Sequence, residues 1–280
     1  VQLITSYRYK RYLNTRDNKS ALRRPVWVIG NLTLGGTGKT PTLIAIVKLL
    51  RQQGIKPGVI SRGFGSKCNY PYMVTSVDNP EQVGDEALLL AGTLCPVVID
   101  PNRLQAAQYI LDNCECDLIL SDDGLQHYNL PRDLELVVVD NLRQFGNQQQ
   151  LPMGPLREDM TRLKTVDAVL INHKTAAKGV RQFNSQSPQF NMHLQTCTIN
   201  SLDNSVSMEI NEWLEKYQSR TIHAMAAIGD PNSFYRMLES LGINCITHSF
   251  ADHHPYSLDD FADVKATDIV IMTEKDAVKC

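Results

Sequence analysis

The sequence lacks three features that would each place it in a distinct class of protein. No uninterrupted run of about 18 apolar residues is present, so no helix long enough to cross a bilayer is expected. The seven cysteines form no CxxC pair, and Cys114-Glu115-Cys116 is too tight for the usual metal spacing, so reduced thiols in a cytosolic compartment are expected. There is no basic excess either: 28 Lys and Arg against 30 Asp and Glu give a net charge of -2. We therefore expect no general nucleic-acid binding.

What remains is an ordinary globular composition, with 42% hydrophobic and 21% charged residues over 280 positions. This length fits one large domain or two smaller ones. The sequence opens on Val1 rather than Met and stops at Cys280 directly after an apparent strand, so a longer natural protein is expected.

The first 24 residues form a basic segment with interleaved tyrosines at positions 7, 9 and 12. Such a segment is either a solvated basic helix or a stretch lying against anionic lipid, where each basic residue contributes about 1 kcal/mol. Composition alone does not decide between the two. The basic residues are Arg8, Lys10, Arg11, Arg16, Lys19, Arg23 and Arg24.

Short apolar segments alternate with longer helical patterns, which predicts an α/β fold with a mainly parallel sheet covered by helices on both faces. After residue 182, Gln, Asn and Ser accumulate, and residues 190–200 alternate as a half-exposed strand does. A smaller α/β lobe is expected beyond this linker. The expected strands are 25–30, 58–61, 95–100, 117–121, 134–140, 168–172, 221–228 and 268–272, with helices at 40–53, 103–113 and 232–241.

A glycine-rich loop follows the first expected strand and precedes the first long helix. This order presents backbone N–H groups and a helix N-terminus to phosphate oxygens. Lys39 would reach the β- and γ-phosphates of a nucleotide, and the Thr40 hydroxyl would ligate Mg²⁺. The consensus glycine six residues before the lysine is replaced by Thr33. The expected nucleotide-binding residues are Thr33, Leu34, Gly35, Gly36, Thr37, Gly38, Lys39 and Thr40.

Two carboxylates follow another expected strand at Asp122 and Asp123. Adjacent aspartates after a strand are often only a turn or a helix cap. Beside a phosphate-binding loop, however, they are expected to hold Mg²⁺ directly or through water.

Three further polar motifs allow either a structural or a functional interpretation. Asp85 in Gly84-Asp85-Glu86 could simply cap a helix. Asp252-His253-His254 could be a surface turn, and residues 154–158 could be an ordinary loop. Without further information the chain is thus interpreted as a P-loop phosphotransferase or NTPase whose acceptor is not identified.

Seven segments together resemble the tetraacyldisaccharide 4′-kinases of lipid A biosynthesis, in the order found in that family. They are 30–41 (GNLTLGGTGKTP), 61–65 (SRGFG), 83–86 (VGDE), 121–127 (SDDGLQH), 154–158 (GPLRE), 250–253 (FADH) and 273–276 (TEKD). The resemblance runs from about residue 25 to the end of the sequence. It implies a P-loop NTPase-like kinase domain at 25–188 after the membrane-proximal segment 1–24. A linker at 189–217 and a smaller lobe at 218–280, expected to be truncated, would follow.

The resemblance also implies roles for individual residues. Asp85 would be the catalytic aspartate with His253 as its partner, although His254 competes for that role, and a histidine beside the carboxylate can orient it and relay the proton. Lys39 would act with them. Arg103, Gln126 and Arg157 would contact phosphate or substrate. The Mg²⁺ ligands would be Thr40, Asp122 and Glu158, with Asp123 nearby and the choice between the two aspartates left open.

The implied reaction transfers the γ-phosphate of ATP, with Mg²⁺, to the 4′-hydroxyl of tetraacyldisaccharide 1-phosphate, giving lipid IVA. The implied place is the cytoplasmic face of a Gram-negative inner membrane, with peripheral attachment or an N-terminal anchor outside this sequence. The expected partners are the lipid substrate and the membrane surface, with no obligate protein partner.

Two other classes compete with this interpretation. Asn172-His173-Lys174 and 273–276 resemble base-reading motifs of GTPases, which would suit a P-loop switch or metal chaperone. A non-catalytic membrane adaptor is the second alternative, but the intact Lys39 and Thr40 argue against it.

Overall fold

The computed structural model describes residues 2–15, 22–173, 186–193, 195–196 and 198–280. The chain divides into two compact units, Val1–His193 and Leu194–Cys280. The expected Lys174 of the base-reading motif lies outside the described residues.

The first unit is built on an eight-stranded sheet with the order β3-β4-β2-β5-β1-β6-β7-β8. All neighbouring strands run parallel except β3, which is antiparallel to β4. The strands are β1 Val26–Gly30, β2 Pro57–Ser61, β3 Tyr72–Val74, β4 Val97–Ile99, β5 Leu118–Asp122, β6 Leu134–Asp140, β7 Ala168–His173 and β8 Gln189–His193. The predicted α/β class with a mainly parallel sheet is therefore confirmed.

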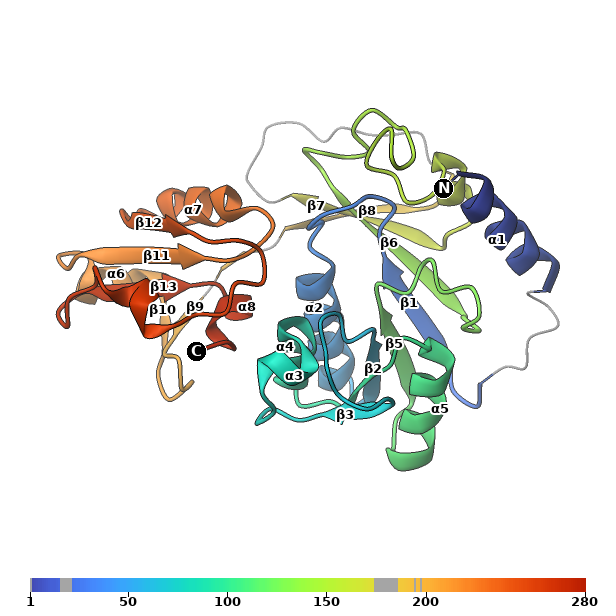
Figure 1. Cartoon of the computed structure of the whole chain (residues 1–280), viewed down its shortest axis with the longest axis horizontal. Coiled ribbons are helices and arrows are strands. Elements are labelled where there is room, and N and C mark those ends of the chain that lie inside the picture. The colour runs from blue at the N-terminus through green and yellow to red at the C-terminus, as the bar shows by residue number, and fades with distance from the viewer. Residues whose placement is uncertain (1, 16–21, 174–185, 194, 197) are drawn as a thin grey trace. The chain divides into compact units, whose positions relative to one another are not determined.

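Helices cover both faces of this sheet. Figure 1 shows α2 (Lys39–Gln52) and α4 (Asp85–Ala91) on one side of the central strands and α5 (Arg103–Asn113) on the other. Leu43 and Val47 of α2 are fully buried, as the spacing of its apolar residues predicted. Helix α5 begins where the Asn102 side chain accepts a hydrogen bond from the Leu104 N–H. The other helices among the described residues of this unit are α1 Gln2–Thr15, α3 Pro80–Val83 and the 3₁₀ turn Met160–Lys164.

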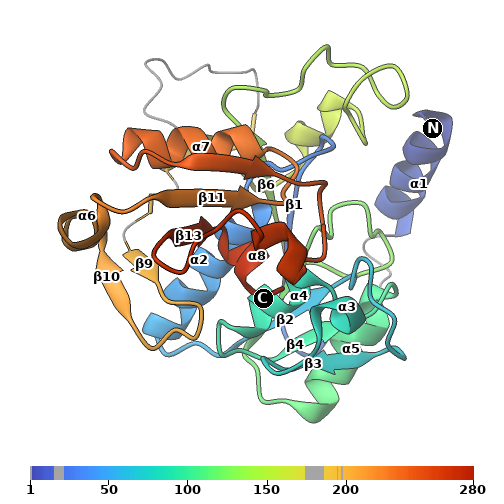
Figure 2. The same ribbon diagram turned by 60° about the vertical axis from the view of Figure 1, so that its left-hand side comes forward.

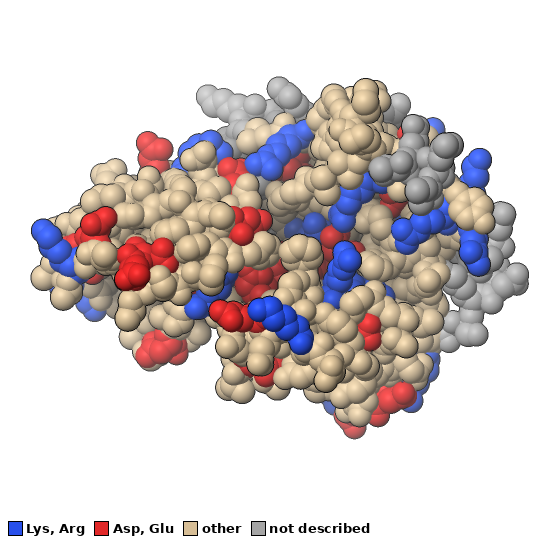
Figure 3. Space-filling view, in the orientation of Figure 1, with Lys and Arg blue, Asp and Glu red and all other residues tan. Residues whose placement is uncertain are grey.

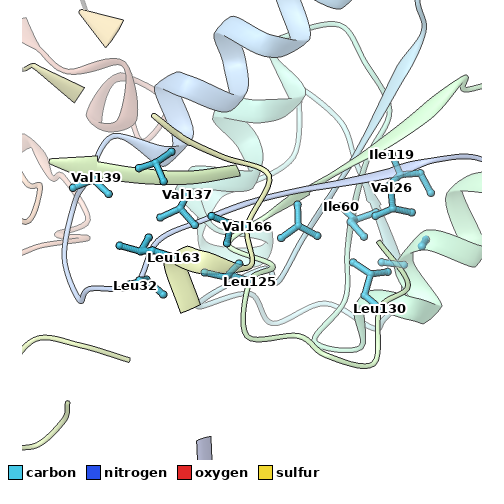
Figure 4. Close-up of a cluster of buried hydrophobic side chains, with 14 of the residues drawn as sticks. Val26, Leu32, Ile60, Ile119, Leu125, Leu130, Val137, Val139, Leu163 and Val166 are labelled. Carbon is cyan, nitrogen blue, oxygen red and sulfur yellow. The ribbon is translucent and has the colours of Figure 1, made fainter. Parts of the chain in front are cut away.

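A continuous apolar core fixes the strands that carry the loops of interest. Val26, Ile60 and Ile119 from neighbouring strands are buried together, and Leu125 and Leu130 from the loop after β5 belong to the same cluster (Figure 4). Because the central strands are parallel, their carboxyl ends meet at one edge of the sheet. The loop after β1 and the ends of β2, β5 and β7 therefore come together there.

The second unit has a parallel sheet in the order β12-β11-β13 and a separate antiparallel pair, β9 and β10. Figure 2 brings this unit forward and shows α7 (Pro231–Ser240) beside β11. Its core includes Trp213, Phe234 and Leu238. The other elements are β9 Thr198–Asn200, β10 Ser207–Glu209, α6 Ile210–Tyr217, β11 Ile222–Ala226, β12 Ile246–Ser249, the 3₁₀ turn Leu258–Phe261, β13 Ile269–Met272 and α8 Glu274–Ala277.

Candidate active site

The glycine-rich loop lies between β1 and α2, as the sequence predicted. Gly38 immediately precedes α2 with a φ of 92°, a left-handed conformation that glycine adopts without steric cost. The helix then begins at Lys39, so its free N–H groups lie at the loop. This is the arrangement that binds phosphate at a helix N-terminus.

Two buried asparagines form hydrogen bonds to this loop. One follows β1 and the other lies in β7, the two strands that flank β6. The Asn31 amide donates to Thr37 Oγ1 at 3.1 Å and to the Gly35 carbonyl at 3.4 Å. From the end of β7, the fully buried Asn172 donates to the Thr37 carbonyl at 3.0 Å. The sequence predicted no role for Asn31, and only the alternative NTPase interpretation placed Asn172 in a motif that resembles base-reading motifs. In the structure the Asn172 amide instead supports the loop backbone.

The segment 154–158 lies against the first residues of the loop. Thr33, which replaces the consensus glycine, is buried and forms an antiparallel bridge with Leu156. The next residue, Leu34, donates its N–H to the Pro155 carbonyl at 2.8 Å. A threonine is therefore accommodated at this position by strand-like pairing, and two sequence motifs more than 120 positions apart become neighbours.

Asp123 is at the centre of an ionic cluster beside the glycine-rich loop. Both of its carboxylate oxygens accept from the Arg157 guanidinium, at 2.7 and 2.9 Å, and Lys39 Nζ lies 3.7 Å from Oδ1. Burial acts to raise the pKa of Asp123, but the hydrogen bond from Arg157 and the nearby positive charges outweigh it, so the pKa lies below its usual value. The φ of Asp123 is 46°, an uncommon conformation for a residue other than glycine.

Asp122 occupies a different environment at the end of β5. Its carboxyl is buried, with Ser61 Oγ 3.4 Å from Oδ2 and no hydrogen-bond partner for Oδ1 within the described chain. Burial raises its pKa to about 7, and the negative charges of Glu86 and Asp123 add to the effect. An apposed cation would relieve this penalty.

The Gly84-Asp85-Glu86 motif begins helix α4. Gly84 has a φ of 88°, and a Cβ there would lie 2.7 Å from the Phe64 carbonyl oxygen, so the motif packs directly on residues 61–65. Asp85 is buried, and its Oδ1 accepts the Glu86 N–H at 2.8 Å. Glu86 influences the Asp122 carboxyl through its charge, a proximity that sequence reasoning missed.

Arg103, the first residue of α5, is buried at the same edge of the sheet. It donates to the carbonyl of Asp100 at 2.9 Å and to that of Asp122 at 3.2 Å. Burial lowers its pKa to about 10, which leaves it positively charged at neutral pH. Gln126, also predicted to contact phosphate, donates to the Asn31 carbonyl at 3.2 Å, as Arg157 does at 3.0 Å. Both side chains are thus tied to the residue that follows β1.

A cavity of about 610 Å³ lies beside Arg103, between helix α1 and the loop after β5. Arg8 and Arg11 of α1 line its opposite wall, and Figure 3 shows Lys and Arg side chains gathered on the side of the first unit that carries α1. His127 also lines the cavity. Burial lowers the His127 pKa to about 4, with a further contribution from the Arg103 charge, so its imidazole is neutral at pH 7. The cavity therefore suits an anionic, hydrogen-bonding ligand.

Glu158 does not join the cluster of its neighbour Arg157. Its carboxylate is buried, and Oε2 accepts from the Tyr128 hydroxyl and lies 3.5 Å from Arg162 Nε. The other oxygen, Oε1, has no hydrogen-bond partner among the described residues. One oxygen of Glu158 thus has a structural role, whereas the other is buried without a hydrogen-bond partner among the described residues.

Carboxylate donors for the predicted Mg²⁺ ion lie at the end of β5 and just after it. No group of three His, Cys, Asp or Glu side chains suited to a metal is found within the described part of the chain. Magnesium, however, is commonly held by one or two carboxylates together with water and substrate phosphates. Asp122, with a buried unpartnered oxygen at the end of the strand beside β1, fits that requirement better than Asp123, whose oxygens are both engaged.

In the second unit, His253 follows Asp252, and its Nε2 lies 3.8 Å from Asp252 Oδ2. Its φ of 63° is again left-handed, in a half-exposed turn. Lys275 lies 3.5 Å from the other oxygen of Asp252. By contrast, His254 Nε2 is 3.1 Å from Asp260 Oδ2, so the competing histidine is engaged in its own lobe.

The 273–276 motif has a structural role in this unit. Asp276 is fully buried, and its oxygens accept from the Ala227 N–H at 3.2 Å, from Thr273 Oγ1 at 2.7 Å and from Lys279 Nζ at 2.8 Å. It thereby fixes the end of β11 to the start of α8. Asp85 and His253 belong to different units, so their predicted pairing stays a prediction.

None of the helices described is both long and apolar enough to cross a membrane.

Comparison with known proteins supports one family. The model of a family described as tetraacyldisaccharide-1-P 4′-kinase matches residues 1–280. The tetraacyldisaccharide 4′-kinase of Nitrosococcus oceani is 43% identical, over all of this chain and 79% of that protein. That of Coxiella burnetii is 42% identical, over 91% of this chain and 72% of its own length. A crystal structure of LpxK from Aquifex aeolicus in complex with ATP is similar at a TM-score of 0.81 and 26% identity, covering 99% of this chain and 86% of that one.

Proposed function

The chain belongs to the tetraacyldisaccharide-1-P 4′-kinase family, and from this premise we propose how its residues carry out the reaction. The enzyme transfers the γ-phosphate of ATP to the 4′-hydroxyl of tetraacyldisaccharide 1-phosphate, giving lipid IVA. The observation that carries the proposal is the meeting of the glycine-rich loop, the Asp123–Arg157–Lys39 cluster and Asp122 at one edge of the sheet.

Positive charge at this edge of the sheet binds the phosphates of the nucleotide. The loop N–H groups and the α2 N-terminus hold the phosphates, and Lys39 neutralises charge on the transferred group. Arg157 stands 2.7 Å from Asp123, which fixes its guanidinium before any substrate binds. Since phosphoryl transfer needs mainly positioning and charge neutralisation, preformed cations of this kind supply much of the catalysis.

Mg²⁺ would be held by the Thr40 hydroxyl and Asp122, with Glu158 and Asp123 as further candidates. The metal would neutralise charge on the β- and γ-phosphates. The unpartnered, buried Oδ1 of Asp122 and its raised pKa support this assignment, because a bound cation favours the ionised carboxylate.

Asp85 is the proposed base that accepts the proton of the acceptor hydroxyl. Its burial and its position at the start of α4 hold the carboxylate in one place. His253 from the second unit is proposed to orient that carboxylate and relay the proton. The left-handed conformation of His253 supports a functional role, because such strain concentrates at functional sites.

The acceptor head group is proposed to occupy the basic cavity between α1 and the loop after β5. Arg103, Arg8 and Arg11 would pair with its phosphate, and the neutral His127 would hydrogen-bond to it. Because the acyl chains of such an acceptor stay in a bilayer, the enzyme is proposed to work at the cytoplasmic face of the inner membrane, where ATP is present. Lys10, an exposed basic residue of α1 that does not line the cavity, would face anionic lipid.

Nucleotide turnover tests this proposal against the P-loop switch. Turnover of ATP should depend on added tetraacyldisaccharide 1-phosphate, and GTP should replace ATP poorly. Equal turnover with and without the lipid would favour an NTPase instead. Asn172 supports the kinase, since it is fully buried and bonded to the loop backbone rather than free to contact a base.

A further inference from the structure

A cluster of aromatic rings and guanidinium groups lies beneath helix α1. We call it the aromatic–guanidinium cluster. The Tyr128 ring is 5.6 Å from that of Tyr9 and 5.0 Å from that of Tyr12, measured between centroids. The Arg132 guanidinium lies 5.2 Å from the Tyr12 ring and 5.6 Å from the Tyr128 ring, and that of Arg162 lies 4.9 Å from the Tyr9 ring. The members are Tyr9, Tyr12, Tyr128, Arg132 and Arg162.

Helix α1 is fixed to this cluster by a hydrogen bond as well as by its rings. The Tyr9 hydroxyl donates to Thr165 Oγ1 at 2.7 Å, and Arg162 donates to the same oxygen at 2.7 Å. Tyr12 is buried, whereas Tyr7 on the same helix is 66% exposed. Cation–π contacts gain strength when they are desolvated, so the covering helix contributes to the stability of the charges under it.

The same guanidinium groups hold the loop that follows the paired aspartates. Arg132 donates to the carbonyls of Leu125 at 3.0 Å, of Leu130 at 3.2 Å, and of His127. These bonds set the backbone of residues 125–130, and His127 of this loop lines the cavity. Glu135 neutralises both Arg132, at 2.9 Å, and Arg162.

Tyr128 connects this cluster to the carboxylate of Glu158. Its hydroxyl donates a hydrogen bond to Glu158 Oε2. Glu158 directly follows Arg157, the partner of Asp123. Glu158 Oε2 accepts from the Tyr128 hydroxyl and lies 3.5 Å from Arg162 Nε, and both of these side chains contact rings of α1.

We propose that Tyr128 is a positioning residue of the kinase and that helix α1 acts through it. The rings of Tyr9 and Tyr12 keep Tyr128 where its hydroxyl fixes Glu158 and where loop 125–130 forms the cavity wall. Helix α1 is then a part of the catalytic framework in addition to any contact that it makes with lipid. The catalytic role of Tyr128 rests on the proposed function, whereas the physical link between α1 and loop 125–130 does not.

Three variants of the whole chain test the link. Tyr9→Leu removes a ring from the cluster, Tyr9→Phe keeps the ring and loses only the hydroxyl, and Tyr128→Phe keeps the stack and removes the bond to Glu158. Tyr7→Leu, an exposed position on the same helix, is the matched control. Amide hydrogen exchange of residues 125–130, the Kd for ATP, and kcat and KM for the acceptor are measured for each.

Tyr9→Leu should speed exchange in residues 125–130 and lower kcat about tenfold, because small misplacements at a reacting site are costly. ATP affinity should stay close to that of the wild type. Tyr9→Phe should restore most of kcat. Tyr128→Phe should lower kcat with little change in exchange at 125–130, and Tyr7→Leu should change neither quantity.

Unchanged exchange in Tyr9→Leu, or unchanged kcat in both Tyr9→Leu and Tyr128→Phe, would overturn the proposal. So would a parallel loss of ATP affinity, which indicates general destabilisation. If the wild type itself transfers no phosphate to the lipid, the proposed function has failed, and the exchange data still decide whether α1 holds the loop.

Discussion

Asp122 and Asp123 are adjacent, but their carboxylates lie in opposite environments. Arg157 and Lys39 surround Asp123 and lower its pKa, whereas Asp122 is buried beside Ser61 with a pKa of about 7. The sequence could place both at the end of a strand, but it could not choose between them. That choice depends on which positive groups the fold brings to each carboxylate, and these groups come from segments far away in the chain.

The proposed roles of Lys39 and Asp85 differ in a way that kinetics can separate. Lys39→Ala should cut turnover by orders of magnitude and weaken ATP binding, because it removes charge at the phosphates. Asp85→Ala should cut turnover similarly but largely spare ATP binding, since Asp85 is assigned to the acceptor hydroxyl. Calorimetric titration with ATP, alongside turnover, distinguishes the two. Near-normal turnover of Asp85→Ala would remove that residue from the chemistry.

His127 provides a pH-dependent prediction at the same scale. Burial first, and then the Arg103 charge, lowers its pKa from 6.5 to about 4 in the folded protein. Because the unfolded chain takes up this proton more readily, the contribution of His127 to stability is complete above pH 6.5 and is lost as the pH falls towards 4.

We therefore expect the imidazole resonances of His127 to show no titration above about pH 5 in NMR spectra. The free energy of unfolding of His127→Gln should also fall less steeply than that of the wild type between pH 6.5 and 4. A titration midpoint near 6.5 would contradict the buried environment described above.

At the scale of elements, the conformation of the glycine-rich loop depends on side chains that lie outside the loop's own motif. Asn172 at the end of β7 and Asn31 after β1 both bond to its backbone or side chains. Asn172→Ala removes one buried hydrogen bond and leaves the Thr37 carbonyl unsatisfied, at a cost of about 1–3 kcal/mol.

ATP affinity of Asn172→Ala should consequently drop about tenfold, which corresponds to about 1.4 kcal/mol. Asn113→Ala, which alters an exposed amide at the end of α5, serves as the control. Fluorescence titration with a labelled ATP analogue measures both. Equal affinity of the two variants would show that the loop keeps its shape without Asn172.

The strands and helices that build this site could be predicted from the sequence because their apolar patterns are long and uninterrupted. Helix 103–113 and strand 134–140 were predicted with the bounds that the structure has. Strand β3, three residues long and antiparallel, was missed because it is too short to show a pattern. The bracing by Asn31 and the proximity of Glu86 to Asp122 were missed too, since both depend on contacts between distant segments.

At the scale of the whole molecule, the proposed catalytic pair divides between the two units. Asp85 belongs to the first unit and His253 to the second. If Asp85 and His253 act together in proton transfer, the effects of their substitutions on kcat are non-additive.

The double variant Asp85→Ala/His253→Ala should then turn over little more slowly than Asp85→Ala alone. His254→Asn is the control, because His254 bonds to Asp260 and its loss should affect the stability of the second unit rather than kcat. Fully additive losses in kcat would mean that Asp85 and His253 act independently.

Product analysis by mass spectrometry tests the central claim most directly. The protein is mixed with ATP, Mg²⁺ and detergent-dispersed tetraacyldisaccharide 1-phosphate, with Lys39→Ala as the matched control. Our account predicts a lipid product that gains one phosphate, carried at the 4′ position, only with the wild type. Absence of that product from a folded sample that binds ATP would contradict the account and point to a P-loop NTPase.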